Sequence, residues 1–133
     1  MRLALLLTLL FILAIPAHAD DIASAQSVIS AQEQAFGRDD AAAAYSYAAP
    51  AIRERFPAAD MFMTMVRNAY TPVYRHKSFE FGEGKVEGDW IAQRVHITDT
   101  NGEMWEALYT LERESDGSLK ITGCTLLKAG EVV

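Results

Sequence analysis

Hydrophobic and polar positions in the second half of the chain alternate with the period of two that is typical of β-strands. In residues 90–98, one face of the predicted strand carries Ile91, Gln93, Val95 and Ile97. In residues 104–111, the corresponding face carries Trp105, Ala107, Tyr109 and Leu111. A further run covers residues 119–127. The pattern therefore predicts consecutive strands, each with an apolar face.

Two glycine-containing dipeptides separate these runs. Asn101-Gly102 lies between the first and second run, and Asp116-Gly117 lies between the second and third. Both dipeptides favour a two-residue hairpin turn of type I′, because both central residues of that turn need positive φ. The sequence therefore predicts an antiparallel meander with turns at opposite ends.

An earlier strand is predicted in residues 73–83. Within it, Phe79 and Phe81 fall on the side opposite Ser78 and Glu80. An irregular turn into the next strand is expected at the glycines that follow, which are Gly82, Gly84 and Gly88.

The first half of the chain has helical spacing instead. Asp21 is expected to cap a helix that ends at Gly37. The stripe of this helix that faces the core consists of Ile22, Ala25, Ile29, Gln32 and Phe36. Helices before a sheet of this kind predict an α+β domain in which N-terminal helices pack on a curved antiparallel sheet.

Shorter helices are predicted before the sheet. Asp39 is expected to cap an alanine-rich helix that ends before Pro50, because the residue preceding a proline avoids the helical region. A helical turn follows at residues 52–56, and Asp60 is expected to cap a helix over residues 61–70. The predicted buried stripe of this last helix includes Phe62, Val66, Ala69 and Tyr70, with Met61 or Met65 on its flank.

The N-terminal residues 1–19 have the three parts of a signal peptide. Arg2 precedes an apolar run that ends at Ile15, which is shorter than the roughly 20 residues needed to span a bilayer. A small-residue site follows, so cleavage is expected after Ala19. The sequence thus predicts one secreted or periplasmic domain over residues 20–133, without stable membrane insertion.

The net charge limits the possible partners of the chain, and its cysteine content limits disulfide formation. The formal net charge of −6 argues against nucleic acid or an anionic membrane surface, since both need a basic patch. Cys124 is the single cysteine of the chain, so it cannot form an internal disulfide. We expect it to be a small core residue.

Several local motifs match one family pattern: Ala49-Pro50-Ala51-Ile52, residues 62–67, residues 70–75, Gln93-Arg94-Val95, Asp99 with Gly102, and Asp116-Gly117 through Cys124. In these motifs the chain resembles the small secreted bacterial proteins described as domain of unknown function 4864. Leu119 departs from that pattern, because it lies where the family tends to carry tryptophan. The resemblance implies a cone-shaped fold similar to nuclear transport factor 2 and the ketosteroid isomerases, often dimeric, and it implies no activity.

Catalytic and metal-binding signatures are weak. His76 and His96 are far apart in sequence, and no His, Cys or carboxylate cluster has the spacing of metal ligands, so no metal or cofactor is expected. The fold of the ketosteroid isomerases can hold a carboxylate base opposite a tyrosine hydroxyl. Candidate donors are Tyr45, Tyr70, Tyr74 and Tyr109, and candidate bases are Asp99 and Glu106. Both carboxylates are better explained as solvated or turn-forming side chains, so no catalytic residue is assigned.

A ligand-binding site is the more specific hypothesis. Pro72 fixes the backbone between Tyr70 and Tyr74-Arg75, which limits the freedom of these side chains. Gln93 lies on an otherwise apolar face, and a buried amide needs a hydrogen-bond partner. We therefore expect Tyr70, Tyr74, Arg75 and Gln93 to line one small-molecule site.

The sequence as a whole favours a non-enzymatic binding or accessory domain with an aromatic-lined pocket. A small lyase or isomerase using the same pocket is one alternative. A protein-interaction module that uses the exposed face of the sheet is another. Apolar residues on both faces of the predicted sheet also suggest a homodimer.

Overall fold

The computed structural model describes residues 10–12 and 17–130. Five helices come first: α1 (Ala17–Gly37), α2 (Ala41–Ser46), α3 (Pro50–Arg55), α4 (Ala59–Ala69) and α5 (Thr71–Tyr74). Four strands follow: β1 (Ser78–Glu87), β2 (Trp90–Thr98), β3 (Met104–Arg113) and β4 (Leu119–Lys128). The strands form one antiparallel sheet in the order β1-β2-β3-β4, so the predicted α+β class is confirmed.

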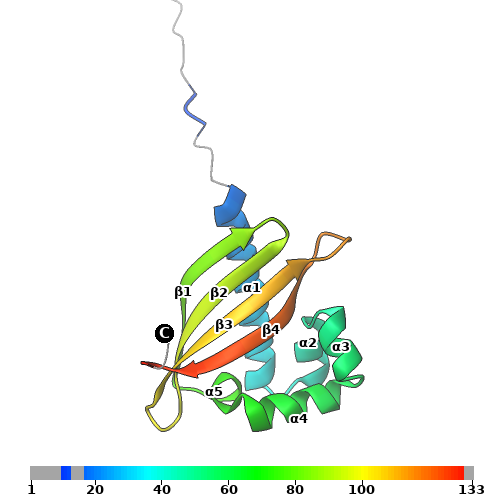
Figure 1. Cartoon of the computed structure of the whole chain (residues 1–133), viewed down its shortest axis with the longest axis vertical. Coiled ribbons are helices and arrows are strands. Elements are labelled where there is room, and N and C mark those ends of the chain that lie inside the picture. Colours follow the sequence, from blue (N-terminus) through cyan, green and yellow to red (C-terminus); the bar gives the residue numbers. More distant parts are fainter. Residues whose placement is uncertain (1–9, 13–16, 131–133) are drawn as a thin grey trace, which may run out of the picture.

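The helices cover one face of this sheet. Figure 1 shows α1 crossing behind the strands, with α2 to α5 gathered at one end of the sheet beside β4. The expected stripe of α1 is confirmed, because Ala25, Ile29, Gln32 and Phe36 are buried and Ile22 packs against the core. In the part of the chain that the structure describes, no helix has the length and apolar character of a membrane span.

The predicted starts of three helices are wrong. α1 begins at Ala17, and the Asp21 carboxylate accepts a hydrogen bond from Arg113 at 2.8 Å instead of capping the helix. Asp40, one residue after the predicted cap, accepts from the backbone of Ala43 at the start of α2. α4 begins after Ala58, which places Asp60 in its first turn. For α2, the neighbouring Asp39 and Asp40 compete for the same cap, and the sequence does not decide between them.

Two details of the helical region also differ from expectation. In α4, Met63 is buried together with Phe62 and Val66, whereas Ala69 is exposed near the end of the helix. Pro72 does not simply end α4, because it lies at the start of the short helix α5.

Most of the apolar run that suggested a signal peptide lies outside the described residues.

The first strand starts later than predicted. Val73 belongs to α5, and β1 extends through Gly82 and Gly84 instead of turning there. The register shifts between Phe81 and Gly84, which marks a bulge. A Cβ atom on Gly84 would lie 2.5 Å from Oε1 of Gln93, so these glycines permit close packing within the strand.

Both predicted hairpins exist, but their loops are longer than two residues. Thr98 pairs with Met104, and Arg113 pairs with Leu119. In each loop only the glycine has positive φ, at 83° for Gly102 and 86° for Gly117. Type I′ turns need positive φ at two residues, so these are not type I′ turns. The side chain of Asp99 stabilises the first loop by accepting hydrogen bonds from the loop backbone.

The two faces of the sheet differ in character. The inner face is buried under the helices and includes Ile91, Val95, Ile97, Ala107, Tyr109 and Leu111. The outer face carries apolar side chains with large exposed fractions, at 50% for Trp90, 65% for Met104 and 38% for Leu127. Leu119, the departure from the family pattern, is buried at the start of β4.

Candidate functional site

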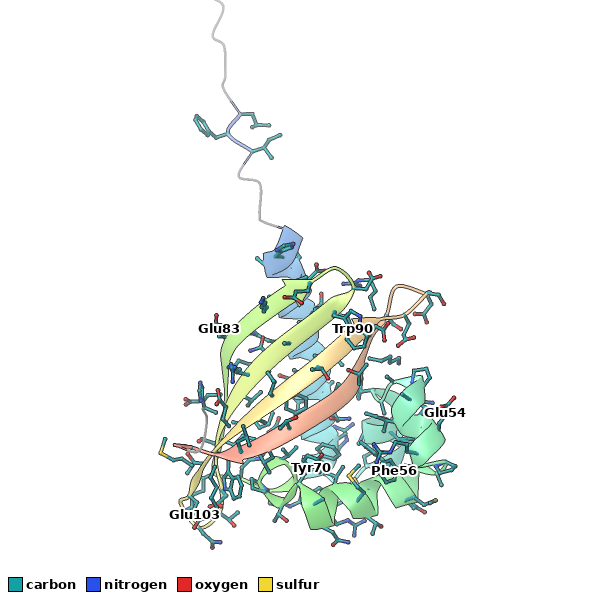
Figure 2. The ribbon with its side chains drawn as sticks, in the orientation of Figure 1. Glu54, Phe56, Tyr70, Glu83, Trp90 and Glu103 are labelled. Carbon is teal, nitrogen blue, oxygen red and sulfur yellow. The ribbon has the colours of Figure 1, made fainter. Side chains whose placement is uncertain are left out.

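A cavity of about 490 Å³ lies between the inner face of the sheet at β3 and β4 and the helices that cover it. Small-molecule sites commonly have volumes of roughly 300–1,000 Å³. Figure 2 shows Phe56 and Tyr70, two of the lining residues, at the same end of the molecule, between β4 and α4. The helices contribute Gln32, Phe36, Ile52, Arg55, Phe56, Phe62, Met65, Val66, Ala69, Tyr70 and Val73, and the strands contribute Tyr109, Thr110, Ile121, Thr122, Gly123, Cys124 and Thr125.

The free edge of β4 forms one side of this cavity. The segment between α2 and α3 pairs with only one position of that edge, where Ile121 N donates to Tyr47 O and Ala49 N donates to Ile121 O, both at 2.8 Å. This pairing holds α3 against β4. Beyond Ile121, the part of β4 that lines the cavity is therefore not covered by that segment.

Aromatic side chains form the wall contributed by the helices. The ring of Phe62 lies 6.3 Å from Phe36 and 5.7 Å from Tyr45, measured between ring centroids. The Tyr45 hydroxyl donates to the carbonyl of Phe56 at 2.6 Å, which ties α2 to the end of α3. These contacts fix the position of the apolar wall.

The polar groups inside the cavity are mostly neutral donors. Burial raises the pKa of the Cys124 thiol to about 12, and a hydrogen bond with Tyr109 opposes part of that shift. Burial also raises the pKa of Tyr109 well above its usual value, and it raises the pKa of Tyr70. All three groups therefore keep their protons at neutral pH. Gln32 is satisfied by donating to the carbonyl of Ala44 at 3.1 Å.

Arg55 is the charged residue of the cavity lining in the described chain. Its side chain is exposed, and its guanidinium carbon lies 6.0 Å from the centroid of the Phe56 ring. Its charge lowers the pKa of Tyr70, against the larger effect of burial. Among the described residues, Arg55 makes no ion pair or side-chain hydrogen bond.

Only one of the expected site residues lines the cavity. Tyr70 does so, at the junction of α4 and α5. Tyr74 and Arg75 instead meet Asp39 in the loop after α1: the Tyr74 hydroxyl hydrogen-bonds Asp39, and the Arg75 guanidinium contacts the same carboxylate at 2.8 Å. Arg75 also donates to the carbonyl of Phe36 at 2.8 Å. This cluster joins α5 to the end of α1.

Gln93 lies beside the β1 bulge, apart from both the cavity and the cluster around Asp39. It is completely buried, and its amide nitrogen donates to the carbonyls of Gly82 and Arg94 at 3.0 and 2.9 Å. Its amide oxygen accepts from Gln26 of α1 at 3.3 Å. The expected convergence of Gln93 with Tyr74 and Arg75 is therefore wrong, because the β1 bulge and α1 satisfy the amide.

The two candidate bases are also outside the cavity. Asp99 accepts hydrogen bonds from the indole of Trp105 and from two backbone N–H groups of its loop, each at 2.9 Å. The hydrogen bond from Trp105 is the largest cause that lowers the pKa of Asp99, and the two backbone hydrogen bonds lower it further. Glu106 pairs with Arg94 at 3.1 Å on the outer face of the sheet. In the described chain, the cavity lining contains no Asp, Glu or His.

Histidines are separated in the structure as well. The Nε2 atom of His76 lies 2.8 Å from a carboxylate oxygen of Glu33 in α1, and its Nδ1 atom lies 3.0 Å from the carbonyl oxygen of Pro72. His96 is exposed on the outer face of the sheet. The described residues contain no group of three or more His, Cys, Asp or Glu that can hold a metal ion.

Sequence reasoning left several lining residues out of the site. Tyr109 was considered as a donor and Cys124 as a core residue, and strand pairing places them opposite each other in the cavity. Arg55 gave no signal, because a single arginine in a short helix is usually solvated. The polar side chain of Gln93 on an apolar face marked a buried hydrogen bond and not the cavity.

Comparison with known proteins identifies the fold and the family of this chain. A crystal structure of an NTF2-like protein of unknown function from Silicibacter pomeroyi matches with a TM-score of 0.58 and 16% sequence identity, over 84% of this chain and 98% of that chain. This likeness defines the fold as NTF2-like. The family model described as "Domain of unknown function (DUF4864)" matches residues 18–132, so the chain belongs to that family. A search of curated proteins found no match.

Proposed function

We propose that this protein is a non-enzymatic binding domain that holds a small, largely apolar molecule in the cavity between β4 and the helices. The observation that carries the proposal is the composition of the lining, in which aromatic and aliphatic side chains surround a few fixed donors. This is the usual make-up of a small-molecule site. Tyr70 is the expected ligand-binding residue that fits this site.

An isomerase or lyase of the ketosteroid isomerase type is the alternative. General-base catalysis needs a base within hydrogen-bond reach of the proton that it removes. The titratable groups that line the cavity in the described chain, apart from Arg55, are tyrosines and one thiol, and burial raises the pKa of Tyr70, Tyr109 and Cys124. Groups that keep their protons are suited to donating hydrogen bonds, which supports binding.

Titration with a fluorescent apolar probe tests the proposal. N-phenylnaphthylamine should bind in a saturable, one-to-one manner and brighten on entering the cavity. Ala69→Trp places a large ring at an exposed position of the lining and should weaken binding at least about tenfold by filling space. Asn68→Trp is the matched control, because the neighbouring Asn68 is exposed and does not line the cavity. Equal binding by both variants would contradict the proposal.

We further propose that the domain acts after export, with cleavage following Ala19. Such a cut would leave α1 to begin with Asp20 and Asp21, and acidic residues at a helix N-terminus are favourable. Intact-mass analysis of protein from its native cell should give a chain that begins at Asp20. A mass that includes residues 1–19 would exclude this processing.

The outer face of the sheet supports a second candidate function, which is self-association or the docking of a partner protein. Met104 and Leu127 expose large apolar side chains at one end of that face, and Trp90 exposes one at the opposite end. Large exposed apolar patches often mark interaction surfaces. Light scattering at high micromolar concentration should report a dimer if this face joins two copies, and a monomer would remove the homodimer from the account.

A further inference from the structure

The cavity has a cationic rim in a protein whose formal net charge is −6. Arg55 supplies this charge, and in the described chain its guanidinium is not engaged by a carboxylate. Of the other arginines on or near α3 to α5, Arg67 lies over the Tyr74 ring and does not line the cavity, and two are held by hydrogen bonds or an ion pair. Arg53 donates to the carbonyls of Ala48 and Tyr45, and Arg75 pairs with Asp39.

Donors continue from this rim into the cavity. The hydroxyl of Tyr70 makes no hydrogen bond to another described residue, and it lies close enough to Arg55 for the positive charge to affect its titration. The thiol of Cys124 lies deeper, beside Tyr109. With no carboxylate in the described lining, the cavity offers hydrogen-bond donors and one cation, and an anion is their natural complement.

Resting on the proposed function, we infer that the ligand is an amphiphilic organic anion: its apolar body fills the cavity between Phe62 and the inner face of β4, and its acid group contacts Arg55 and Tyr70 at the rim. The acid group would be a carboxylate, sulfonate or similar oxyanion. Guanidinium groups bind carboxylates and tetrahedral oxyanions with paired hydrogen bonds, which suits Arg55 to this role.

Two probes with the same ring framework separate the charge from the apolar body. Anilinonaphthalene sulfonate carries an anionic group, and N-phenylnaphthylamine lacks it. Both are titrated against the wild type, Arg55→Gln and Arg67→Gln. Arg67 is the matched control, because it is exposed on α4, does not line the cavity and lies over the Tyr74 ring at 5.8 Å.

Arg55→Gln should weaken binding of the sulfonate about fivefold, the upper end for an exposed charge pair, and leave the neutral probe unchanged. Arg67→Gln should change neither affinity. High salt should reduce the effect of Arg55→Gln, because an exposed pair is screened. Circular dichroism of each variant establishes that the fold is retained.

Two results obtained with Arg55→Gln would overturn the inference. One is an unchanged affinity of Arg55→Gln for the sulfonate, and another is an equal loss in Arg55→Gln and Arg67→Gln, which would indicate only long-range attraction. If Ala69→Trp blocks both probes but Arg55→Gln has no selective effect, the result supports the binding function and contradicts the anionic ligand class. If neither probe enters the cavity of the wild type, the result contradicts both the binding function and the anionic ligand class.

Discussion

Tyr109 of β3 and Cys124 of β4 are directly paired across the sheet, and both line the cavity. Burial is the main cause that raises the pKa of each group, and the Cys124 thiol reaches about 12. The thiolate is the reactive form of cysteine, so a thiol with this pKa is a poor nucleophile at neutral pH. The pair is therefore better suited to contacting a ligand than to attacking one.

Labelling of Cys124 should be slow in the folded protein. At neutral pH a maleimide should react at least about a hundredfold more slowly with native protein than with protein in denaturant, because burial both hides the thiol and disfavours the thiolate. A Thr125→Cys variant with Cys124→Ser provides the control, since Thr125 is the adjacent exposed position. Native labelling of Cys124 as fast as that of the control would show that the thiol is accessible and reactive.

Replacement of Gln93 should reduce stability and not ligand binding. Gln93→Leu removes the donor for the carbonyls of Gly82 and Arg94, which should cost about 1–3 kcal/mol in the free energy of unfolding. Urea denaturation measures this loss, and probe titration should give the wild-type affinity. Gln26→Ala, which removes only the 3.3 Å bond to the amide oxygen, should cost less. A stable Gln93→Leu variant that fails to bind the probe would restore Gln93 to the ligand site.

Acid should weaken the hairpin between β2 and β3 through Asp99. The hydrogen bonds that this carboxylate accepts lower its folded pKa below the unfolded value of about 3.9. Its contribution to stability is therefore present above about pH 4 and is lost as the pH falls through the folded pKa. Asp99→Asn should be less stable at neutral pH and lose less stability on acidification, as measured by thermal unfolding. Parallel acid profiles for the two proteins would assign the acid sensitivity to other groups.

The cluster around Asp39 should be structural. Arg75→Gln removes contacts to Asp39 and to the carbonyl of Phe36, and because Arg75 is partly exposed the loss of stability should be about 1 kcal/mol or less. Its affinity for the neutral probe should equal that of the wild type. Denaturation and titration of this one variant separate the two roles, and a selective loss of binding would place the cluster in the functional site.

Much of the sheet was predictable because strand periodicity and turn residues agreed. β2 was located over residues 90–98 on this basis. β1 was misplaced because Gly82 and Gly84 are typical of turns, whereas here they allow Gln93 to pack against a bulge. Loop length was missed because a single glycine with positive φ also closes hairpin loops longer than two residues.

The site was less predictable than the fold. The need of Gln93 for a hydrogen-bond partner was correct, but sequence does not distinguish a ligand from a backbone carbonyl as that partner. The cavity exists because the helices leave part of β4 uncovered beyond Ile121, which is a property of packing and not of local pattern. Arg55 and Cys124 acquire their place in the site only through that packing.

A crystal structure with anilinonaphthalene sulfonate bound tests the central claim most directly. The account predicts density for the naphthalene rings between Phe62 and the inner face of β4, with the sulfonate within hydrogen-bond distance of Arg55 or Tyr70. Density for the probe only on the outer face, near Trp90 or Met104, with the cavity closed by its own side chains, would contradict the claim that this protein binds a small molecule between its helices and its sheet.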